Sequence, residues 1–94
     1  LVVDASHGNS GKDHVRQAEV ATMLVAQIAV DGTAVAGVML ESNLLGGAQT
    51  LDVDAGPAGL VRGRSVTDKC MDWETTESVL RALAGGAQRR QARA

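Results

Sequence analysis

The chain has 94 residues and a formal net charge of -2, because nine lysine and arginine residues stand against eleven aspartate and glutamate residues. Hydrophobic residues make up 45% of the sequence and charged residues 21%, a balance typical of globular proteins and not of disordered or fibrous ones. This length allows one small domain at most, and the charge disfavours a general nucleic-acid binder. The single cysteine excludes an internal disulfide and is compatible with a reducing, cytoplasmic setting. No apolar run is long enough to cross a membrane, so we expect no membrane association.

The composition also predicts that the chain is a fragment of a larger protein, called the parent protein below. It contains one tryptophan and no phenylalanine or tyrosine. A small independent domain usually has more large apolar anchors, or covalent staples. The chain also enters directly in an apolar run, with no initiating methionine and no leader.

The first predicted element is a buried strand over residues 1–5, which are apolar and rich in β-branched side chains. Strand alternation would place Val3, Ala5 and His7 on one side and Val2, Asp4 and Ser6 on the other. A carboxylate inside a buried strand needs a partner, which the sequence does not identify for Asp4.

The next predicted element is an amphipathic helix from Lys12 to about Val30. Ser10 and Asp13 have the spacing of a helix capping box after the turn at residues 8–11. Apolar residues then recur every three or four positions, at Val15, Ala18, Ala21, Val25 and Ile28, with Val20, Met23 and Leu24 widening the face. The pair Asp31-Gly32 is expected to end the helix.

A second apolar strand is predicted over residues 34–40. Two apolar strands joined by a helix of this length indicate a parallel βαβ unit, whose strands are usually covered on both faces. The remaining chain predicts a long glycine-rich loop over residues 42–67, in which residues 50–61 could instead form a short hairpin.

The last predicted element is a helix from Trp73 to about Ala84, capped by Asp72 and ended or loosened by Gly85-Gly86. Its expected apolar stripe is Val79, Leu80 and Leu83. The basic residues Arg89, Arg90 and Arg93 then read as a frayed helix end. Strand, helix, strand, loop and helix is the order of the last two units of an eight-stranded β/α barrel, a fold of roughly 250 residues. The predicted class is therefore α/β.

Polar side chains follow both predicted strands. His7 ends the first and Glu41 directly follows the second, so at one edge of a parallel sheet, with strands about 5 Å apart, both can approach one ion. Asp68 lies where the long loop would return to the same rim. Taken singly, His7 is more often a structural group and Asp68 a turn or helix acceptor. Together they suit a divalent manganese, iron, cobalt or zinc ion.

Three motifs carry a more specific signal. Residues 6–10 read Ser-His-Gly-Asn-Ser, residues 37–44 read Gly-Val-Met-Leu-Glu-Ser-Asn-Leu, and residues 63–70 read Gly-Arg-Ser-Val-Thr-Asp-Lys-Cys. In this order they resemble the C-terminal part of the type I 3-deoxy-D-arabino-heptulosonate 7-phosphate (DAHP) synthases. The resemblance runs from about Leu1 to Ala84, so residues 1–84 would belong to the barrel domain and residues 85–94 to a C-terminal tail.

The resemblance implies an enzyme that opens the shikimate pathway to aromatic amino acids. This enzyme performs a metal-dependent, aldol-type condensation of phosphoenolpyruvate with erythrose 4-phosphate. The resemblance also implies that His7, Glu41 and Asp68 are metal ligands, with His7 and Asp68 as the candidate catalytic residues. The family's fourth ligand, a cysteine, and most of its phosphate-binding cations would lie upstream, in a parent that is generally a homo-oligomer.

Several residues fall outside that implied site. Cys70 is expected to be a buried, inert thiol, and Lys12 a solvated lysine. Arg62 stands where the family usually has an aromatic residue, and residues 53–60 are richer in glycine and alanine than the family suggests.

Two other functions stay open at this point: a non-catalytic metal-binding module, and another metal-dependent barrel aldolase with different substrates. A module should fold alone, whereas a fragment of a synthase should have no activity by itself.

Overall fold

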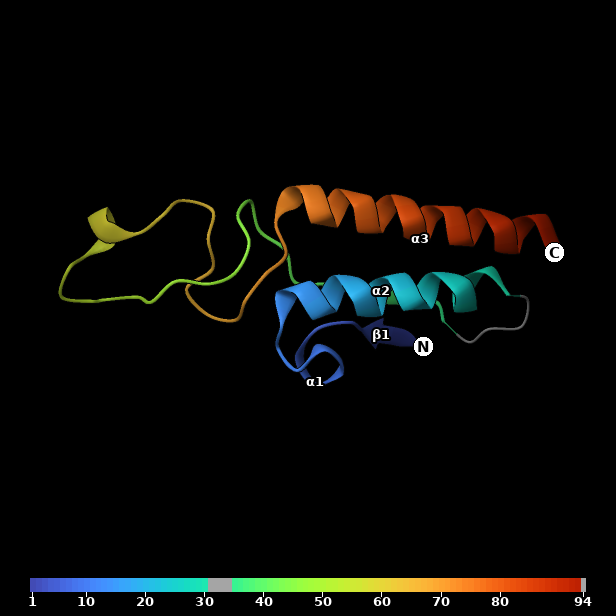
Figure 1. Cartoon of the computed structure of the whole chain (residues 1–94), viewed down its shortest axis with the longest axis horizontal. Helices are drawn as coiled ribbons and strands as arrows, with labels where there is room; N and C mark the ends of the chain where they lie inside the picture. Colours follow the sequence, from blue (N-terminus) through green and yellow to red (C-terminus); the bar gives the residue numbers. More distant parts are fainter. Residues whose placement is uncertain (31–34, 94) are drawn as a thin grey trace.

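The computed structural model of the chain describes residues 1–30 and 35–93. Along the chain they form β1 (Val2–Asp4), α1 (His7–Ser10), α2 (His14–Ala29), β2 (Gly37–Met39), the short 3-10 helix η1 (Pro57–Gly59) and α3 (Trp73–Arg93). The molecule is elongated, with extents of 56 × 23 × 16 Å, and the two long helices occupy one half of it (Figure 1). The architecture is α/β, as predicted. The predicted helix end at Asp31-Gly32 and the predicted strand start at Ala34 lie outside the described residues.

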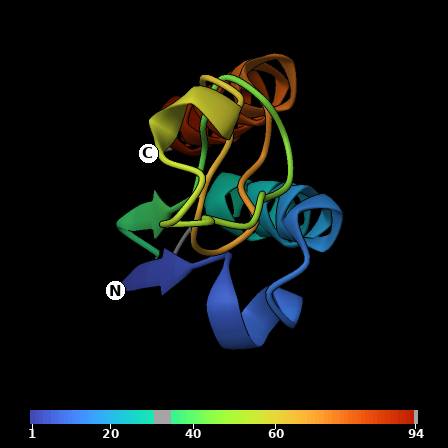
Figure 2. The ribbon, with the colours of Figure 1, turned by 90° about the vertical axis from the view of Figure 1, so that its left-hand side faces the viewer.

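The predicted parallel pairing of the two strands is confirmed. Val2 pairs with Gly37 and Asp4 with Met39. Backbone hydrogen bonds from Ala36 N to Leu1 O (2.7 Å) and from Ala5 N to Met39 O (3.0 Å) extend the pairing beyond both ends. The strands lie side by side with the helices on one side of them (Figure 2). Both strands are shorter than predicted, because the parallel pairing covers only three residues of each strand.

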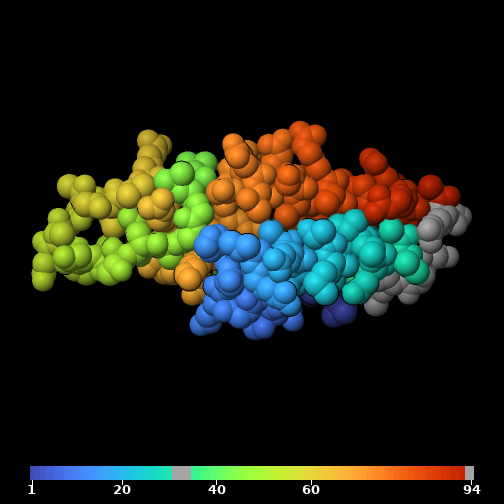
Figure 3. Space-filling model, in the orientation of Figure 1, coloured from blue at the N-terminus to red at the C-terminus, as the bar shows by residue number. Residues whose placement is uncertain are grey.

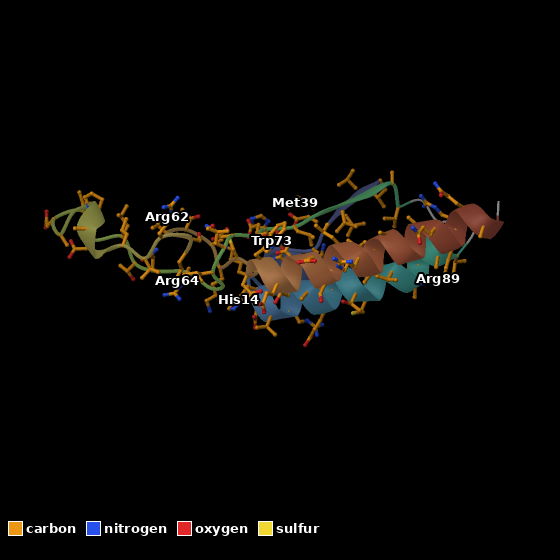
Figure 4. The ribbon with its side chains drawn as sticks, turned by 90° about the horizontal axis from the view of Figure 1, so that it is seen from above. His14, Met39, Arg62, Arg64, Trp73 and Arg89 are labelled. Carbon is orange, nitrogen blue, oxygen red and sulfur yellow. The ribbon has the colours of Figure 1, made fainter. Side chains whose placement is uncertain are left out.

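The helices α2 and α3 run side by side in the same direction. Their first residues, His14 and Trp73, lie at the same end of the helix pair (Figure 4). Between the helices and the strands lie the buried apolar side chains of the core, which are Ala5, Ala21, Leu24, Ile28, Val35, Met71 and Val79.

The start of α2 differs from the prediction. Ser10 ends the separate short helix α1, and Asp13 is the N-cap of α2, where its Oδ1 accepts from Val15 N at 2.9 Å and Arg16 N at 3.4 Å. The capping box predicted at Ser10 is therefore wrong. The chain turns between the two helices through left-handed residues Gly11 and Lys12, with φ of 62° and 63°.

The buried face of α2 agrees with the predicted one at Ala21, Leu24 and Ile28 and differs from it at Gln17, Val15 and Met23. Its buried side chains include Gln17, Ala21, Leu24 and Ile28. By contrast, Val15 and Met23 are 60% and 62% exposed. The apolar residues of α2 lie on several sides of the helix, so periodicity alone predicted part of the packing face but not its limits.

Helix α3 continues to Arg93, nine residues beyond the predicted end, so the prediction that Gly85-Gly86 ends it is wrong. A Cβ on Gly86 would lie only 3.0 Å from the backbone oxygen of Val25, so this glycine allows α3 to approach α2 closely. Arg90 donates from Nη1 to Val35 O at 3.0 Å, which holds the helix end against the second strand's segment. The expected frayed end is therefore wrong for the described part of α3, although Arg89 is exposed.

Residues 43–66 form a long projection, called the arm below, which extends beyond the helices (Figures 1 and 3). No strand is assigned over residues 50–61, all of which are described, so the alternative of a hairpin there is wrong. The side chain of Gln49 instead closes the arm: Nε2 donates to Val61 O and Arg64 O, and Oε1 accepts from Val61 N, each at 2.8 Å. Figure 4 shows Arg62 and Arg64 on this arm, away from the helices, and Arg62 is exposed.

Of the helices in residues 1–30 and 35–93, none combines the length and the hydropathy needed to cross a bilayer.

Candidate metal centre

The first part of the site is the turn that follows β1. The chain leaves the strand after Asp4, and His7 adopts a φ of 48°, a left-handed conformation that is uncommon for residues other than glycine. The His7 carbonyl accepts a hydrogen bond from Lys12 N at 2.9 Å, and this bond stabilises the left-handed conformation. Strand alternation therefore ends before His7, and the prediction that Asp4 and His7 point to opposite sides is wrong.

The turn supplies the partner that Asp4 requires. Oδ2 of Asp4 lies 2.9 Å from Nδ1 of His7, and Oδ1 accepts from the backbone N–H of Ser6 at 2.8 Å and from the Ser6 hydroxyl. These hydrogen bonds, with that of the Ser6 hydroxyl the largest contribution, lower the pKa of Asp4 to about 2. Asp4 is therefore ionised at neutral pH.

Glu41 is positioned by two neighbours. Its backbone N–H donates to Oε1 of Gln17 at 2.5 Å, and its carbonyl accepts from Met71 N at 3.0 Å. Gln17 is 1% exposed and is the polar member of the buried face of α2. Sequence reasoning gave Gln17 no role; its signal was an amide in the middle of an apolar helix face, where a buried polar group needs a partner.

Asp68 reaches the site because the arm folds back on its own start. Gly47 and Cys70 exchange two backbone hydrogen bonds, at 2.8 and 3.1 Å, and Asn43 N donates to Met71 O at 2.9 Å. These contacts bring the end of the arm beside the segment that follows β2. The sequence indicated that the loop would return to the rim, but not which residues would pair.

The structure brings the three predicted side chains together. Nε2 of His7 lies 2.9 Å from Oε1 of Glu41 and 3.4 Å from Oδ2 of Asp68. One donor atom from each residue falls within 4.8 Å of the others, which is the spacing that a single cation can bridge. The hydrogen bond to Asp4, followed by the negative charge of Glu41, raises the pKa of His7 above its usual value.

This donor set has a definite chemistry. One imidazole nitrogen and two carboxylates suit a borderline divalent ion, and three protein ligands leave coordination positions for other groups. Cys70 is partly exposed, so the prediction that it is buried is wrong. It is not a member of the group found among the described residues, and its Sγ lies 3.6 Å from the backbone oxygen of Asp68. Lys12 is exposed, as expected.

The sequence matches one protein family over most of its length. The family model described as the DAHP synthetase I family matches residues 1–81. The chain belongs to the DAHP synthetase I family.

Individual members of this family are similar throughout the chain. A phospho-2-dehydro-3-deoxyheptonate aldolase of Corynebacterium glutamicum is 52% identical over 98 residues, covering 100% of this chain and 27% of the relative. The phenylalanine-inhibited aldolase of the same name from Saccharomyces cerevisiae is 43% identical over 91 residues, covering 97% of this chain and 25% of the relative.

Solved structures agree with the family assignment. The phospho-2-dehydro-3-deoxyheptonate aldolase of Francisella tularensis SCHU S4 superposes with a TM-score of 0.83 at 45% identity, over 95% of this chain and 25% of that one. The chain thus spans about a quarter of the length of the DAHP synthetase I proteins it matches.

Proposed function

We propose that this chain forms the last two β/α units of a (β/α)8 barrel, in a parent protein that is a DAHP synthase. The parent condenses phosphoenolpyruvate with erythrose 4-phosphate and releases inorganic phosphate. The family membership, the names of the relatives and the quarter-length coverage support the proposal. The parallel register of β1 and β2 and the two covering helices have the arrangement of adjacent barrel units. Family membership favours this function over a barrel aldolase of another type.

We propose that His7, Glu41 and Asp68 hold a divalent manganese, iron, cobalt or zinc ion. The observation that carries this proposal is the meeting of the three donor atoms within 4.8 Å, from segments far apart along the chain. When bound, such an ion supplies Lewis-acid polarisation of a carbonyl oxygen, here the aldehyde of erythrose 4-phosphate. The fourth ligand, a cysteine, and most phosphate-binding cations are proposed to come from other parts of the parent protein.

The two carboxylates are proposed to differ in role. The Asp68 side chain is 43% exposed, whereas that of Glu41 is 22% exposed and its backbone is held by Gln17. Glu41 is therefore the more fixed ligand, and Asp68 is the carboxylate better placed to exchange a proton with substrate or solvent. The Nε2 atom of His7 faces both of these carboxylates. A cytoplasmic homo-oligomer remains our proposal for the parent.

The variant Glu41→Ala in the parent protein tests the site. We expect loss of bound metal and of synthase activity, with an unchanged far-ultraviolet circular dichroism spectrum. Glu19→Ala is the matched control, because Glu19 is an exposed glutamate on α2 that pairs only with Arg16, at 3.1 Å, among the ion pairs of the described residues. Metal content measured by elemental analysis decides the matter, and full occupancy in Glu41→Ala would refute the ligand assignment.

A further inference from the structure

Both ring nitrogens of His7 face oxygen atoms, but on opposite sides of the ring. Nε2 faces Glu41 and Asp68, as described above. Nδ1 faces Oδ2 of Asp4 and the hydroxyl oxygen of Ser6, each at 2.9 Å. Oxygen acceptors therefore face both ring nitrogens, and a neutral imidazole has one proton to share between them.

The Nδ1 side offers only acceptors. A carboxylate has no proton to give, and the hydroxyl proton of Ser6 is donated to Oδ1 of Asp4. When a cation occupies the Nε2 side, the proton of the neutral ring must then be on Nδ1, where Asp4 accepts it. The lone pair consequently resides on Nε2, the atom that points toward Glu41 and Asp68 and the one that a cation requires.

The two oxygens of Asp4 have separate tasks. Oδ1 closes the turn, because it accepts from the backbone and the hydroxyl of Ser6, a residue that is 2% exposed. Oδ2 accepts from the His7 ring. Asn9 also fastens the turn by donating from Nδ2 to the backbone oxygen of Asp4. The backbone of the turn thus has supports that do not involve Oδ2.

We infer that Asp4 is a positioning residue, which holds His7 in the Nδ1-protonated tautomer so that Nε2 is presented to the cation. This inference rests on the proposed metal site, and it adds a residue that does not touch the cation. A carboxylate behind a histidine ligand fixes the orientation of the ring and strengthens its donor nitrogen. Removing such a partner typically weakens metal binding by about 10- to 100-fold.

The tautomer itself can be read without metal. The metal-free parent protein is given the substitution Glu41→Ala, which removes the nearer acceptor on the Nε2 side. It is labelled with 15N in its histidines and studied at alkaline pH, where the ring is neutral. Long-range proton–nitrogen correlation spectra are expected to show His7 protonated at Nδ1, and Asp4→Ala is expected to shift it toward the Nε2-protonated form. An Nε2 proton in the Glu41→Ala protein that retains Asp4 would overturn the inference.

Metal affinity gives the second readout, by calorimetric titration of the unmodified parent protein and its Asp4 variants with Co2+. Asp4→Ala should bind about 10- to 100-fold more weakly. Asp4→Asn should lose less, because its amide oxygen can still accept from Nδ1. Asp4→Asn also tests the inference if the Asp4→Ala variant does not fold. Asn9→Ala is the control for a loosened turn and should keep both the affinity and the tautomer.

The outcomes separate the two proposals. Unchanged affinity in Asp4→Ala, or an equal loss in Asn9→Ala, would overturn the role of Asp4. If instead Glu41→Ala leaves Co2+ binding intact, the metal site itself is wrong. The metal-free spectra still report whether Asp4 sets the tautomer in that case.

Discussion

Glu41 depends on one buried amide for its position. Its backbone N–H donates to Gln17, whose side chain is almost completely enclosed between α2 and the segment after β2. A buried N–H without an acceptor costs about 1–3 kcal/mol. Gln17 therefore connects the packing of α2 with the placement of a proposed metal ligand.

The variant Gln17→Met tests this connection, because methionine is similar in size but offers no strong acceptor. We expect the parent protein to lose about 1–3 kcal/mol of unfolding free energy and to bind metal more weakly. Denaturant unfolding and metal titration measure the two effects. Gln27→Met is the matched control on the same helix, where the side chain is exposed, and it should change neither. Equal effects of the two substitutions would show that the hydrogen bond to Glu41 is unimportant.

The sequence predicted the three candidate ligands but not the residues that position them. His7 and Glu41 follow apolar strands, and the three motifs identified Asp68 as their companion. The contact between Asp4 and His7 depends on the left-handed φ of His7, and strand alternation gives the wrong answer there. The role of Gln17 depends on which face of α2 packs, and this is decided by tertiary contacts.

At the level of elements, the start of α2 rests on the Asp13 cap. Hydrogen bonds from the backbone N–H groups of Val15 and Arg16 lower the pKa of Asp13 below 3.8. The pKa of Asp13 is lower in the folded state than in the unfolded state. The ionised cap therefore stabilises the protein fully at pH values above the unfolded-state pKa, and this stabilisation is lost as the pH falls through the folded-state pKa.

The variant Asp13→Asn keeps a capping acceptor but cannot titrate. We expect the variant parent protein to lose less stability than the unmodified protein as pH falls below 3.8, measured by thermal unfolding across acid pH. Asp54→Asn, at an exposed aspartate on the arm, should leave the profile unchanged. A profile of Asp13→Asn that coincides with that of the unmodified protein would contradict the assignment of the cap.

The glycine pair in α3 provides a matched comparison within one helix. A Cβ on Gly85 would meet only the end of the Arg89 side chain, at 3.6 Å, so Gly85→Ala should stabilise the parent protein by about 0.5–1 kcal/mol. A larger side chain on Gly86 must displace the backbone of Val25, so Gly86→Val should destabilise it. A melting temperature that rises for both variants would show that α2 and α3 can move apart without loss of stability.

These glycines also show why the end of α3 could not be predicted. As local signals they end a helix, and without the neighbouring helix that interpretation is reasonable. Close packing on Val25 and the hydrogen bond from Arg90 to Val35 give residues 85–93 a reason to stay helical. The division into a domain over residues 1–84 and a tail over 85–94 remains a prediction, with the family match extending to residue 81.

For the whole molecule, burial is incomplete. Among the described residues, Val2 in β1 and Met39 in β2 are exposed, as are large apolar side chains of the arm, including Leu44, Leu51 and Val53. A groove between β2 and α3 is also lined by apolar side chains, including Val38, Leu40 and Leu83. Exposed apolar surface of this extent is typical of a surface that packs against further protein.

We therefore expect the purified 94-residue chain to have no synthase activity. It offers three donors for a cation, but the fourth ligand and the cations for two phosphorylated substrates are proposed to come from other parts of the parent protein. The measurement is phosphate release from phosphoenolpyruvate in the presence of erythrose 4-phosphate and added Mn2+. The full-length Corynebacterium glutamicum relative, assayed in parallel, controls for the reagents. Measurable turnover by the purified chain would show that these 94 residues alone complete an active site.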